Sequence, residues 1–337
     1  MPYTQVANLD FNQIKASLKE YMRAQSDFTD YDFEGSTLSV LLDTLAYNTY
    51  YTAFNTNMVV NELFIDSATL RDNVVALAKQ LGYRPKSATS PTAYVSFTVT
   101  YSNPTTDTEL LLKKGTGFTA TYENRLFNYV VLEDVKAQVA NGVATFSDVA
   151  INEGTQLTNT FTVNSASKSQ RFVLDNQNID TNTISVRVYP TGGSFNEPYL
   201  VADNILGVDA TSKVFFLDEI EDERYEILMG DGVLGKKLEN NARIEVSYLV
   251  TSGPESNGVR TFTFSGVLEN PDGVSPSSFT IALNSIVAAA GGEEIESTKK
   301  IKNTAPKAYG TQDRAVTAQD YEAIVRKVYP ATSDIII

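Results

Sequence analysis

Residues 36–64 read STLSVLLDTLAYNTYYTAFNTNMVVNELF. Ser36 or Thr37 can begin a helix that continues to about Phe64, well beyond the usual length of roughly 11 residues. Its apolar residues recur at spacings of three and four on two faces. The first face comprises Leu38, Leu42, Leu45, Val59 and Leu63, and the second comprises Tyr47, Tyr50, Tyr51, Phe54 and Met58. Two apolar faces require two sets of neighbours.

No charged residue lies between Asp43 and Glu62, and the asparagines in this stretch argue against a membrane span. A helix rich in Tyr, Asn and Thr suits a bundle whose contacts are mixed polar and apolar, as between chains. A helix buried within its own domain is the alternative.

Two further helices flank the long one. Asp10 can cap the first, in which Phe11, Ile14, Leu18, Tyr21 and Met22 form an apolar stripe. The other is expected to start at Ser67, with Asp66 and Ser67 as a plausible cap, and to stop at Gly82 in the left-handed conformation.

The pattern changes at Gly82-Tyr83-Arg84-Pro85, and from Tyr94 onward apolar residues alternate as in strands. Several short strands without intervening helices favour an antiparallel sandwich or barrel-like module. The expected fold class is therefore α+β and multidomain. We predict a helical domain at 1–86, a β-rich domain at 87–290 with two submodules that divide near 190–215, and a C-terminal part at 291–337.

Residues 303–325 read NTAPKAYGTQDRAVTAQDYEAIV. Pro306 disfavours helix before it, which predicts a linker, and Thr317 can cap a helix from about 318 to 328 that carries Tyr321. Ile335, Ile336 and Ile337 resemble the opening of a buried strand, so further chain or a partner is expected there.

Composition restricts the function. The chain has 27 basic and 41 acidic residues, a net charge of −14, and no Cys, His or Trp. Such a charge argues against nucleic-acid binding, and the missing residue types exclude disulfides, Cys/His zinc sites and His-based triads. We expect no cofactor and no metal. The N-terminus shows no secretory signal and no stretch is apolar enough to span a bilayer, which favours a cytoplasmic origin.

Three short motifs resemble binding or catalytic sites but are better interpreted as turns or loops. GDGVLGK at 230–236 has the glycine and lysine spacing of a phosphate-binding loop, but Lys237 replaces the required Ser or Thr and a strand pattern follows, so a glycine-rich turn is expected. The acidic run 218–223 is most simply a solvated loop rather than a glycosidase pair. DNQNID at 175–180 lacks the glycine of a calcium loop and is interpreted as a turn.

Three blocks carry a family resemblance: residues 43–83, MGDGVLGKK at 229–237 together with 253–258, and residues 305–325. In this order they resemble the wedge-ring subunits of contractile-tailed, T-even-type phage baseplates, of the gene product six type, related to the baseplate J-like proteins. Pro306, Arg314, Thr317 and Tyr321 belong to the last block.

The resemblance implies a structural virion protein of the tail baseplate, assembled in the host cytoplasm and without enzymatic activity. It implies as partners a second copy in each wedge, a bundle-forming wedge subunit and a sheath-initiator subunit, but no nucleic acid and no membrane. The subunits would form a ring around the tail hub and transmit the change that accompanies contraction. A further C-terminal domain would link neighbouring wedges. The alternative function is a receptor-binding or adhesive β-rich tail protein.

Overall fold

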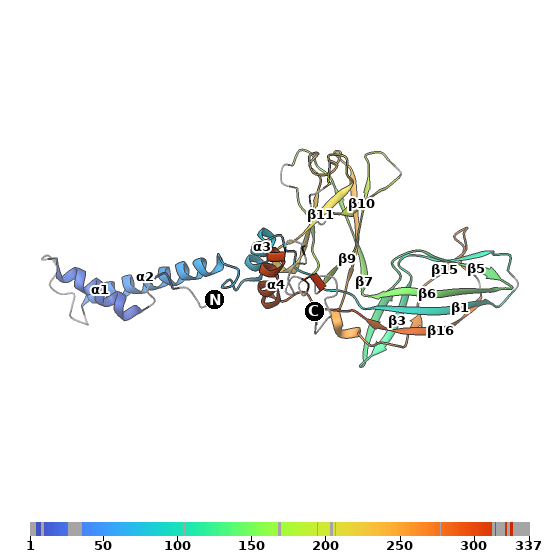
Figure 1. Cartoon of the computed structure of the whole chain (residues 1–337), viewed down its shortest axis with the longest axis horizontal. Coiled ribbons are helices and arrows are strands. Elements are labelled where there is room, and N and C mark those ends of the chain that lie inside the picture. Colours follow the sequence, from blue (N-terminus) through green and yellow to red (C-terminus); the bar gives the residue numbers. More distant parts are fainter. Residues whose placement is uncertain are drawn as a thin grey trace. The chain divides into compact units, whose positions relative to one another are not determined.

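The computed structural model confirms the predicted α+β class: helices at the N-terminal end, a large β-rich region and a helix after it (Figure 1). The chain divides into two compact units, one formed by residues 1–85 with 297–337 and the other by residues 86–296. The three-domain division along the sequence stays a prediction. The structure describes residues 5–7, 10–25, 36–103, 105–167, 170–193, 195–202, 205, 207–276, 278–311, 314, 321 and 324–325.

The first unit begins with a helical hairpin in which α1 (Phe11–Arg23) lies along α2 (Thr37–Glu62) (Figure 1). Asp10 caps α1 as predicted, since its carboxylate accepts hydrogen bonds from the backbone N–H groups of Asn12 and Gln13 at 2.9 and 3.1 Å. The Ser36 hydroxyl caps α2 by accepting from Ser39 N–H at 3.0 Å. Both helices therefore start where the sequence indicated.

The second helical pair consists of α3 (Arg71–Gln80) and α4 (Thr298–Thr311). Their shared core is small: Ala68, Val74, Val75, Ala78, Ile301 and Ala305. Gly82, with φ +75°, ends α3 as predicted. The predicted start at Ser67 is wrong, because α3 begins at Arg71 and the Ser67 hydroxyl instead donates to the carbonyl of Asn61 at 2.6 Å.

Pro306 lies inside α4, so the linker predicted there is wrong. A proline within a helix forfeits one backbone hydrogen bond and disfavours helix at the preceding residue. Here that preceding residue, Ala305, is fully buried with Ile301 against α3. Burial of this apolar face favours the helix, and the exposed proline ring faces away from the core. The predicted cap Thr317 and the triple isoleucine lie outside the described residues.

The β unit contains two sheets with separate cores. All strand pairs of the nine-stranded sheet are antiparallel, and its core centres on Phe97, whose ring stacks on that of Phe146 at 4.8 Å and meets that of Phe118 at 5.9 Å. Its strands are β1 (Thr92–Tyr101), β2 (Glu109–Leu112), β3 (Gly117–Tyr122), β4 (Arg125–Val130), β5 (Val135–Ala140), β6 (Val143–Glu153), β14 (Thr263–Phe264), β15 (Leu268–Glu269) and β16 (Phe279–Ala290).

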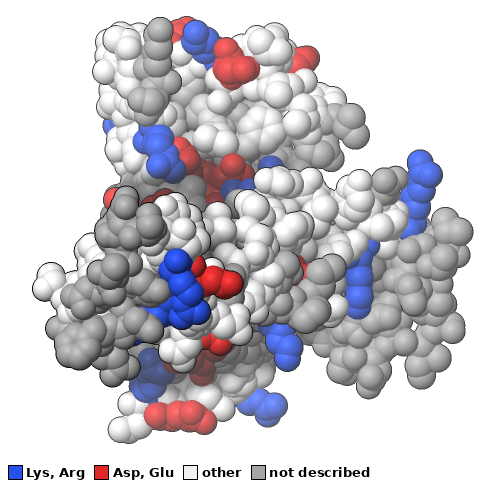
Figure 2. Space-filling view, turned by 90° about the vertical axis from the view of Figure 1, so that its left-hand side faces the viewer, with Lys and Arg blue, Asp and Glu red and all other residues white. Residues whose placement is uncertain are grey.

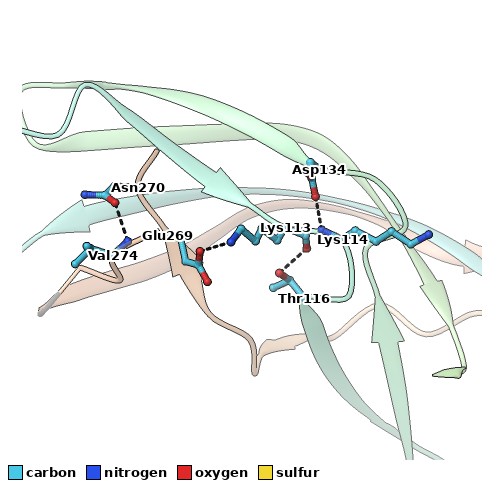
Figure 3. A network of polar contacts seen from close by, with 7 residues as sticks. All are labelled: Lys113, Lys114, Thr116, Asp134, Glu269, Asn270 and Val274. Carbon is cyan, nitrogen blue, oxygen red and sulfur yellow. Dashed lines mark hydrogen bonds and ion pairs between the residues drawn. The ribbon is translucent and has the colours of Figure 1, made fainter. Parts of the chain in front are cut away.

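Polar contacts fix the turn between β2 and β3 (Figure 3). The Lys113 ammonium pairs with Glu269 of β15, and the Thr116 hydroxyl donates to the Lys113 carbonyl at 2.6 Å. The backbone N–H of Lys114 donates to Asp134 at 2.7 Å. A side chain from β15 and one from the loop between β4 and β5 thus hold this turn in place.

The seven-stranded sheet has the order β7-β13-β9-β10-β11-β12-β8. The pair β10 and β11 is parallel, unlike the antiparallel arrangement expected throughout, whereas the other pairs are antiparallel. Its strands are β7 (Thr155–Thr162), β8 (Phe172–Leu174), β9 (Ile179–Tyr189), β10 (Glu197–Val201), β11 (Val214–Glu219), β12 (Tyr225–Met229) and β13 (Arg243–Val250), with 3₁₀ turns at Glu221–Glu223 and Gly253–Ser256.

The seven-stranded sheet is inserted into the nine-stranded one. The chain leaves the first sheet at Gly154 and returns after Val250, so the division differs from the split predicted near 190–215. Alternating strand patterns look the same in both sheets, so they do not reveal which sheet a strand joins.

Buried polar groups join the two sheets at this crossing. The carboxylate of Glu153 accepts hydrogen bonds from the Thr251 hydroxyl at 2.6 Å and from the Ser252 hydroxyl at 2.8 Å. The carboxylate of Asp180 accepts from the backbone N–H and the hydroxyl of Ser90, both at 2.8 Å. Hydrogen bonds of this charge-assisted kind are about twice as strong as neutral ones, so they hold the crossing in one geometry.

Gly154 is required at the crossing. Its φ is +133°, and a Cβ built there would lie 2.6 Å from the carbonyl oxygen of Val250. We predict that Gly154→Ala lowers the free energy of unfolding of the β unit by about 3 kcal/mol or more, as judged by urea denaturation followed by near-UV circular dichroism. Gly192→Ala is the matched control, because Gly192 has φ +72° in open space, and should cost only about 1 kcal/mol. If both variants lost the same free energy of unfolding, this would contradict the conclusion that the Val250 carbonyl oxygen approaches Gly154 closely.

Candidate functional site

The candidate site is the surface of α2. Most of the large apolar side chains on this helix are 42–61% exposed, whereas its buried positions are mainly small or polar. The exposed residues are Val40, Leu41, Leu45, Tyr47, Tyr51, Phe54, Met58, Val59 and, at the C-cap, Leu63. The buried positions, here called the α2 seam, are Ser39, Leu42, Ala46, Ala53, Asn57 and Asn61.

These residues fall on three faces of the helix. At about 100° per residue, the seam, a face containing Leu41, Leu45, Val59 and Leu63, and a face containing Val40, Tyr47, Tyr51, Phe54 and Met58 lie roughly 120° apart. We call the second and third of these the leucine face and the tyrosine face. Among the described elements, α1 is the helix that packs against α2. One neighbour covers one face, and two apolar faces remain open.

The two sequence-predicted faces correspond closely to the two open ones. Leu42 differs, because it is 3% exposed and belongs to the seam. Leu38 and Tyr50 are half-buried. Whether the predicted residues contact a partner stays a prediction.

Aromatic contacts order the tyrosine face. The Tyr47 hydroxyl donates to the Tyr51 hydroxyl at 3.0 Å, and the two rings meet edge to face at 4.7 Å between centroids. Tyr50 meets Tyr51 in the same way at 6.0 Å. The hydrogen bond to Tyr51 raises the pKa of Tyr47 above its ordinary value, so the Tyr47 hydroxyl stays neutral at physiological pH. A partner would therefore meet an uncharged surface that is already in place.

Threonine hydroxyls on the same helix are satisfied internally. Thr49, Thr52 and Thr56 donate to the carbonyl four residues earlier, at 2.8, 2.9 and 2.8 Å. A satisfied donor needs no new hydrogen bond when a surface is buried, so these threonines add little polar cost to docking. At the start of α2, a groove of about 450 Å³ is lined by Thr37, Leu38, Val40, Leu41 and Thr44.

Sequence reasoning missed the role of Asn57. Its side chain is fully buried, and its carboxamide oxygen accepts hydrogen bonds from the backbone N–H groups of Val6 and Ala7 at 2.7 and 2.9 Å. Its amide nitrogen donates to the Ala7 carbonyl at 2.9 Å. Asn57 thereby holds the segment before α1 against α2. The signal in the sequence is a pair of asparagines, at 57 and 61, in line with the small residues of the seam.

Glu62 is a second missed residue. It ends α2 and reaches forward to α3, where its carboxylate accepts hydrogen bonds from Thr69 N–H at 2.7 Å, Thr69 Oγ1 at 2.5 Å and Asn73 Nδ2 at 2.9 Å. Partial burial opposes ionisation, but the bonds from Thr69, Asn73 and the Leu70 N–H outweigh it and lower the pKa of Glu62 to about 2. Glu62 thus satisfies the start of α3 in place of the predicted Ser67.

Three of the predicted C-terminal residues lie in the described part of the chain, and all three are exposed. Pro306 is on the exposed side of α4, and Arg314 is exposed, with its N–H bonded to the Thr311 carbonyl at 2.7 Å. Tyr321 is helical and exposed.

The glycine-rich motif forms a turn, as predicted. GDGVLGK follows β12 and precedes β13, with no helix at the place where a phosphate-binding loop would need one. Asp231 Oδ1 accepts from the N–H groups of Val233 and Leu234 at 2.8 and 2.9 Å. A Cβ on Gly230 would lie 2.3 Å from the carbonyl carbon of Gly235, so the two backbones pack directly together.

The described residues give little support to a catalytic, metal-binding or membrane-spanning role. The solvated loop predicted for the acidic run is wrong at its start, because Asp218 and Glu219 end strand β11 and Glu219 is buried, whereas Glu221 lies in a 3₁₀ turn and is exposed. In DNQNID, residues 175–178 form the turn between β8 and β9, and the last two residues belong to β9. The described part of the chain contains no group of three His, Cys, Asp or Glu residues placed to hold a metal ion. No helix in that part is both long and apolar enough to cross a membrane.

Charged residues are interspersed on the face shown in Figure 2. Lys, Arg, Asp and Glu side chains there are scattered, and uncharged surface lies between many of them.

Comparison with known proteins gives a match first for the helical part of the chain. Residues 10–83, which contain α1, α2 and α3, match the family of the helical domain of gp6-like baseplate wedge proteins. The resemblance predicted from the sequence is thereby confirmed for the helical part of the chain.

A particular relative extends the similarity. The chain is 28% identical over 333 residues to the baseplate wedge protein gp6 of Enterobacteria phage T4, which covers 94% of this chain and 49% of that protein. The chain thus spans about half the length of this relative. A chain in the cryo-EM structure of the anti-feeding prophage (AFP) baseplate aligns over 97% of this chain and 66% of its own length, with 12% identity and a TM-score of 0.31, too low to show a common fold.

The lowered pKa of Glu62 gives a pH prediction. A carboxylate with a lowered pKa in the folded state stabilises above its ordinary pKa of 4.5, and this stabilisation disappears as the pH falls toward about 2. We expect Glu62→Gln to lower the free energy of unfolding of the helical unit by about 1 kcal/mol at neutral pH, measured by urea denaturation with helical circular dichroism. The difference from the unaltered chain should shrink below pH 4.5.

Glu20→Gln is the control for this prediction, because Glu20 is exposed on α1. It should leave the free energy of unfolding nearly unchanged. If Glu62→Gln lowered the free energy of unfolding by the same amount at neutral and at strongly acidic pH, this would contradict the conclusion that the ionised carboxylate of Glu62 caps α3.

Proposed function

We propose that this chain is a structural subunit of the baseplate wedge in a contractile phage tail. The open leucine and tyrosine faces of α2 are the observation that carries the proposal, and the similarity of residues 10–83 to gp6-like helical domains supports it. No enzymatic activity is part of this role.

The proposed action of α2 is to complete a helical bundle with other chains. A two-helix hairpin covers the seam, and each open face has room for one further helix packed at the usual 8–10 Å. Burying the remaining half of a large apolar side chain contributes about 1 kcal/mol, so the nine exposed residues together can exceed the entropic cost of association. The partners proposed are a second copy of the chain, a bundle-forming wedge subunit and a sheath-initiator subunit.

The uncharged surface suits a permanent contact. Between Asp43 and Glu62 the helix has no charge to desolvate, and the threonine hydroxyls are already bonded. Interfaces that form during assembly and persist are more apolar than transient ones. We place the chain in the virion, in the ring around the tail hub, after assembly in the host cytoplasm.

The proposed mechanism is mechanical. In the β unit, Glu153 and Asp180 fix the crossing between the two sheets, and this rigidity would let a displacement at one part of the subunit reach its neighbours. The joined wedges would then change diameter together during contraction.

The alternative, an adhesive tail protein, would bind host glycans through its β unit. The cavity found there measures 290 Å³ and is lined by Ala88, Asn178, Ser252, Gly253, Glu294 and Ile295. None of these residues supplies the aromatic ring on which sugars commonly stack, and the cavity does not favour this function over the wedge.

The bundle is tested by placing charges on its open faces. We expect Leu45→Asp combined with Tyr51→Asp to weaken binding to the other wedge proteins of the same phage by about 100-fold or more, because unpaired carboxylates would be buried. The measurement is sedimentation of mixtures of the purified wedge proteins, with near-UV circular dichroism to verify that the β unit stays folded.

Val233→Asp provides the matched control, since Val233 is 73% exposed and belongs to the β unit, whereas α2 belongs to the other unit. This variant should assemble normally. Full assembly of the Leu45→Asp, Tyr51→Asp chain would refute the bundle.

A further inference from the structure

Two Asn-Gly dipeptides occur in the chain, at 141–142 and at 257–258. An asparagine before glycine is chemically labile, because the glycine nitrogen can attack the asparagine carboxamide carbon and glycine has no side chain that hinders the approach. Valine follows the glycine in both places, so the two Asn-Gly-Val sequences are the same. A difference in their reactivity must therefore come from the fold.

The fold holds both reacting groups of the second dipeptide. The carboxamide oxygen of Asn257 accepts a hydrogen bond from the Gly292 N–H at 3.0 Å, and its nitrogen donates to the Gly292 carbonyl at 2.9 Å. The attacking nitrogen is occupied too, since the Gly258 N–H donates to the Ala289 carbonyl at 2.7 Å. Reaction at Asn257 requires these three hydrogen bonds to open first.

The first dipeptide has no such restraint. Asn141 is exposed in the tight turn between β5 and β6, where it has φ +54° and Gly142 has φ +74°, as in an Asn-Gly hairpin turn. Among the described residues, neither the Asn141 carboxamide nor the Gly142 N–H has a hydrogen-bond partner. Gly142 uses its carbonyl instead, which accepts from the Tyr101 N–H at 2.9 Å.

The ladder next to this turn is short. The register of β5 with β6 consists of Val139 opposite Ala144 and Ala140 opposite Val143. Opening a short stretch at the end of a hairpin costs little free energy compared with global unfolding. The turn can therefore rotate until the Gly142 nitrogen reaches the carboxamide carbon of Asn141.

We infer that Asn141 is a site of spontaneous deamidation in the folded chain and that Asn257 is protected from it. The Gly142 nitrogen forms a bond to Cγ of Asn141, and the carboxamide nitrogen takes up the proton of the Gly142 N–H and leaves as ammonia. Water then adds to one of the two carbonyl carbons of the cyclic imide and breaks that carbon's bond to the Gly142 nitrogen. Addition at Cγ gives aspartate, and addition at the backbone carbonyl gives isoaspartate. No group is oxidised or reduced.

The products alter the turn in two ways. Either product adds a negative charge to a chain whose net charge is already −14. Isoaspartate also places the Cβ atom of residue 141 in the backbone, and the length of a tight turn fixes the register of its hairpin. The longer backbone should weaken the pairing of β5 with β6. These residues lie in the β unit, so the inference does not depend on the proposed wedge function of α2.

The experiment compares the two dipeptides within one protein. The folded full chain is incubated at mildly alkaline pH, and tryptic peptides from successive times are analysed by mass spectrometry with fragmentation, which locates the replacement of an amide NH₂ by OH. Asn141 should deamidate at least about tenfold faster than Asn257, because the hydrogen bonds around Asn257 must open first.

The same chain unfolded in urea is the control, since the two Asn-Gly-Val sequences should then react at similar rates. Equal rates at Asn141 and Asn257 in the folded chain would overturn the inference. It would also fail if Asn141 reacted in urea but not in the folded chain.

A substitution tests the effect of isoaspartate on the turn. Asn141→Asp adds the same charge without the extra backbone atom, and Asp-Gly suits the same turn, so this variant should unfold at nearly the urea midpoint of the unaltered chain. The isoaspartate form, separated by ion exchange, should unfold at a lower urea concentration. Equal midpoints for the isoaspartate form and Asn141→Asp would contradict the weakened pairing of β5 with β6.

Discussion

The arrangement of the helical unit depends on one constraint: α2 has two apolar faces besides its seam, and the hairpin with α1 covers only the seam. The seam is built for close approach, with Ala46 and Ala53 at its centre and Asn57 fixing the segment before α1. The bulky residues are kept for the other two faces. Because small residues give the closest helix contact and large ones give the most apolar area, the sequence separates the permanent internal contact from the surfaces left for other chains.

The sequence correctly predicted the features that depend on residues close to one another in the chain. Asp10 and Ser36 cap helices because their side chains reach N–H groups two or three residues away, and Gly82 stops a helix because it accepts a positive φ. The strands from Tyr94 onward and the turn at GDGVLGK were likewise correct. The two open faces of α2 were visible as spacing, apart from Leu42, whose burial depends on where α1 lies.

The errors arise from contacts between distant residues. Pro306 should end a helix, but the burial of Ala305 and Ile301 against α3, more than 200 residues earlier in the chain, favours the helical state. Ser67 looked like a cap, yet Glu62 from the preceding helix takes that place. Membership of the two sheets and the parallel pairing of β10 with β11 are also decided by long-range pairing, which periodicity does not encode.

The nested arrangement of the two sheets has a consequence for the history of such a chain. The seven-stranded sheet begins at Thr155 and ends at Val250, and these two residues are direct partners across β7 and β13. A segment whose two ends are neighbours can lengthen, shorten or be exchanged for another without displacing the host sheet on either side. The inserted sheet can therefore change in sequence and length independently of the nine-stranded sheet. The residues around Gly154 and Glu153 keep the junction between the two sheets in place.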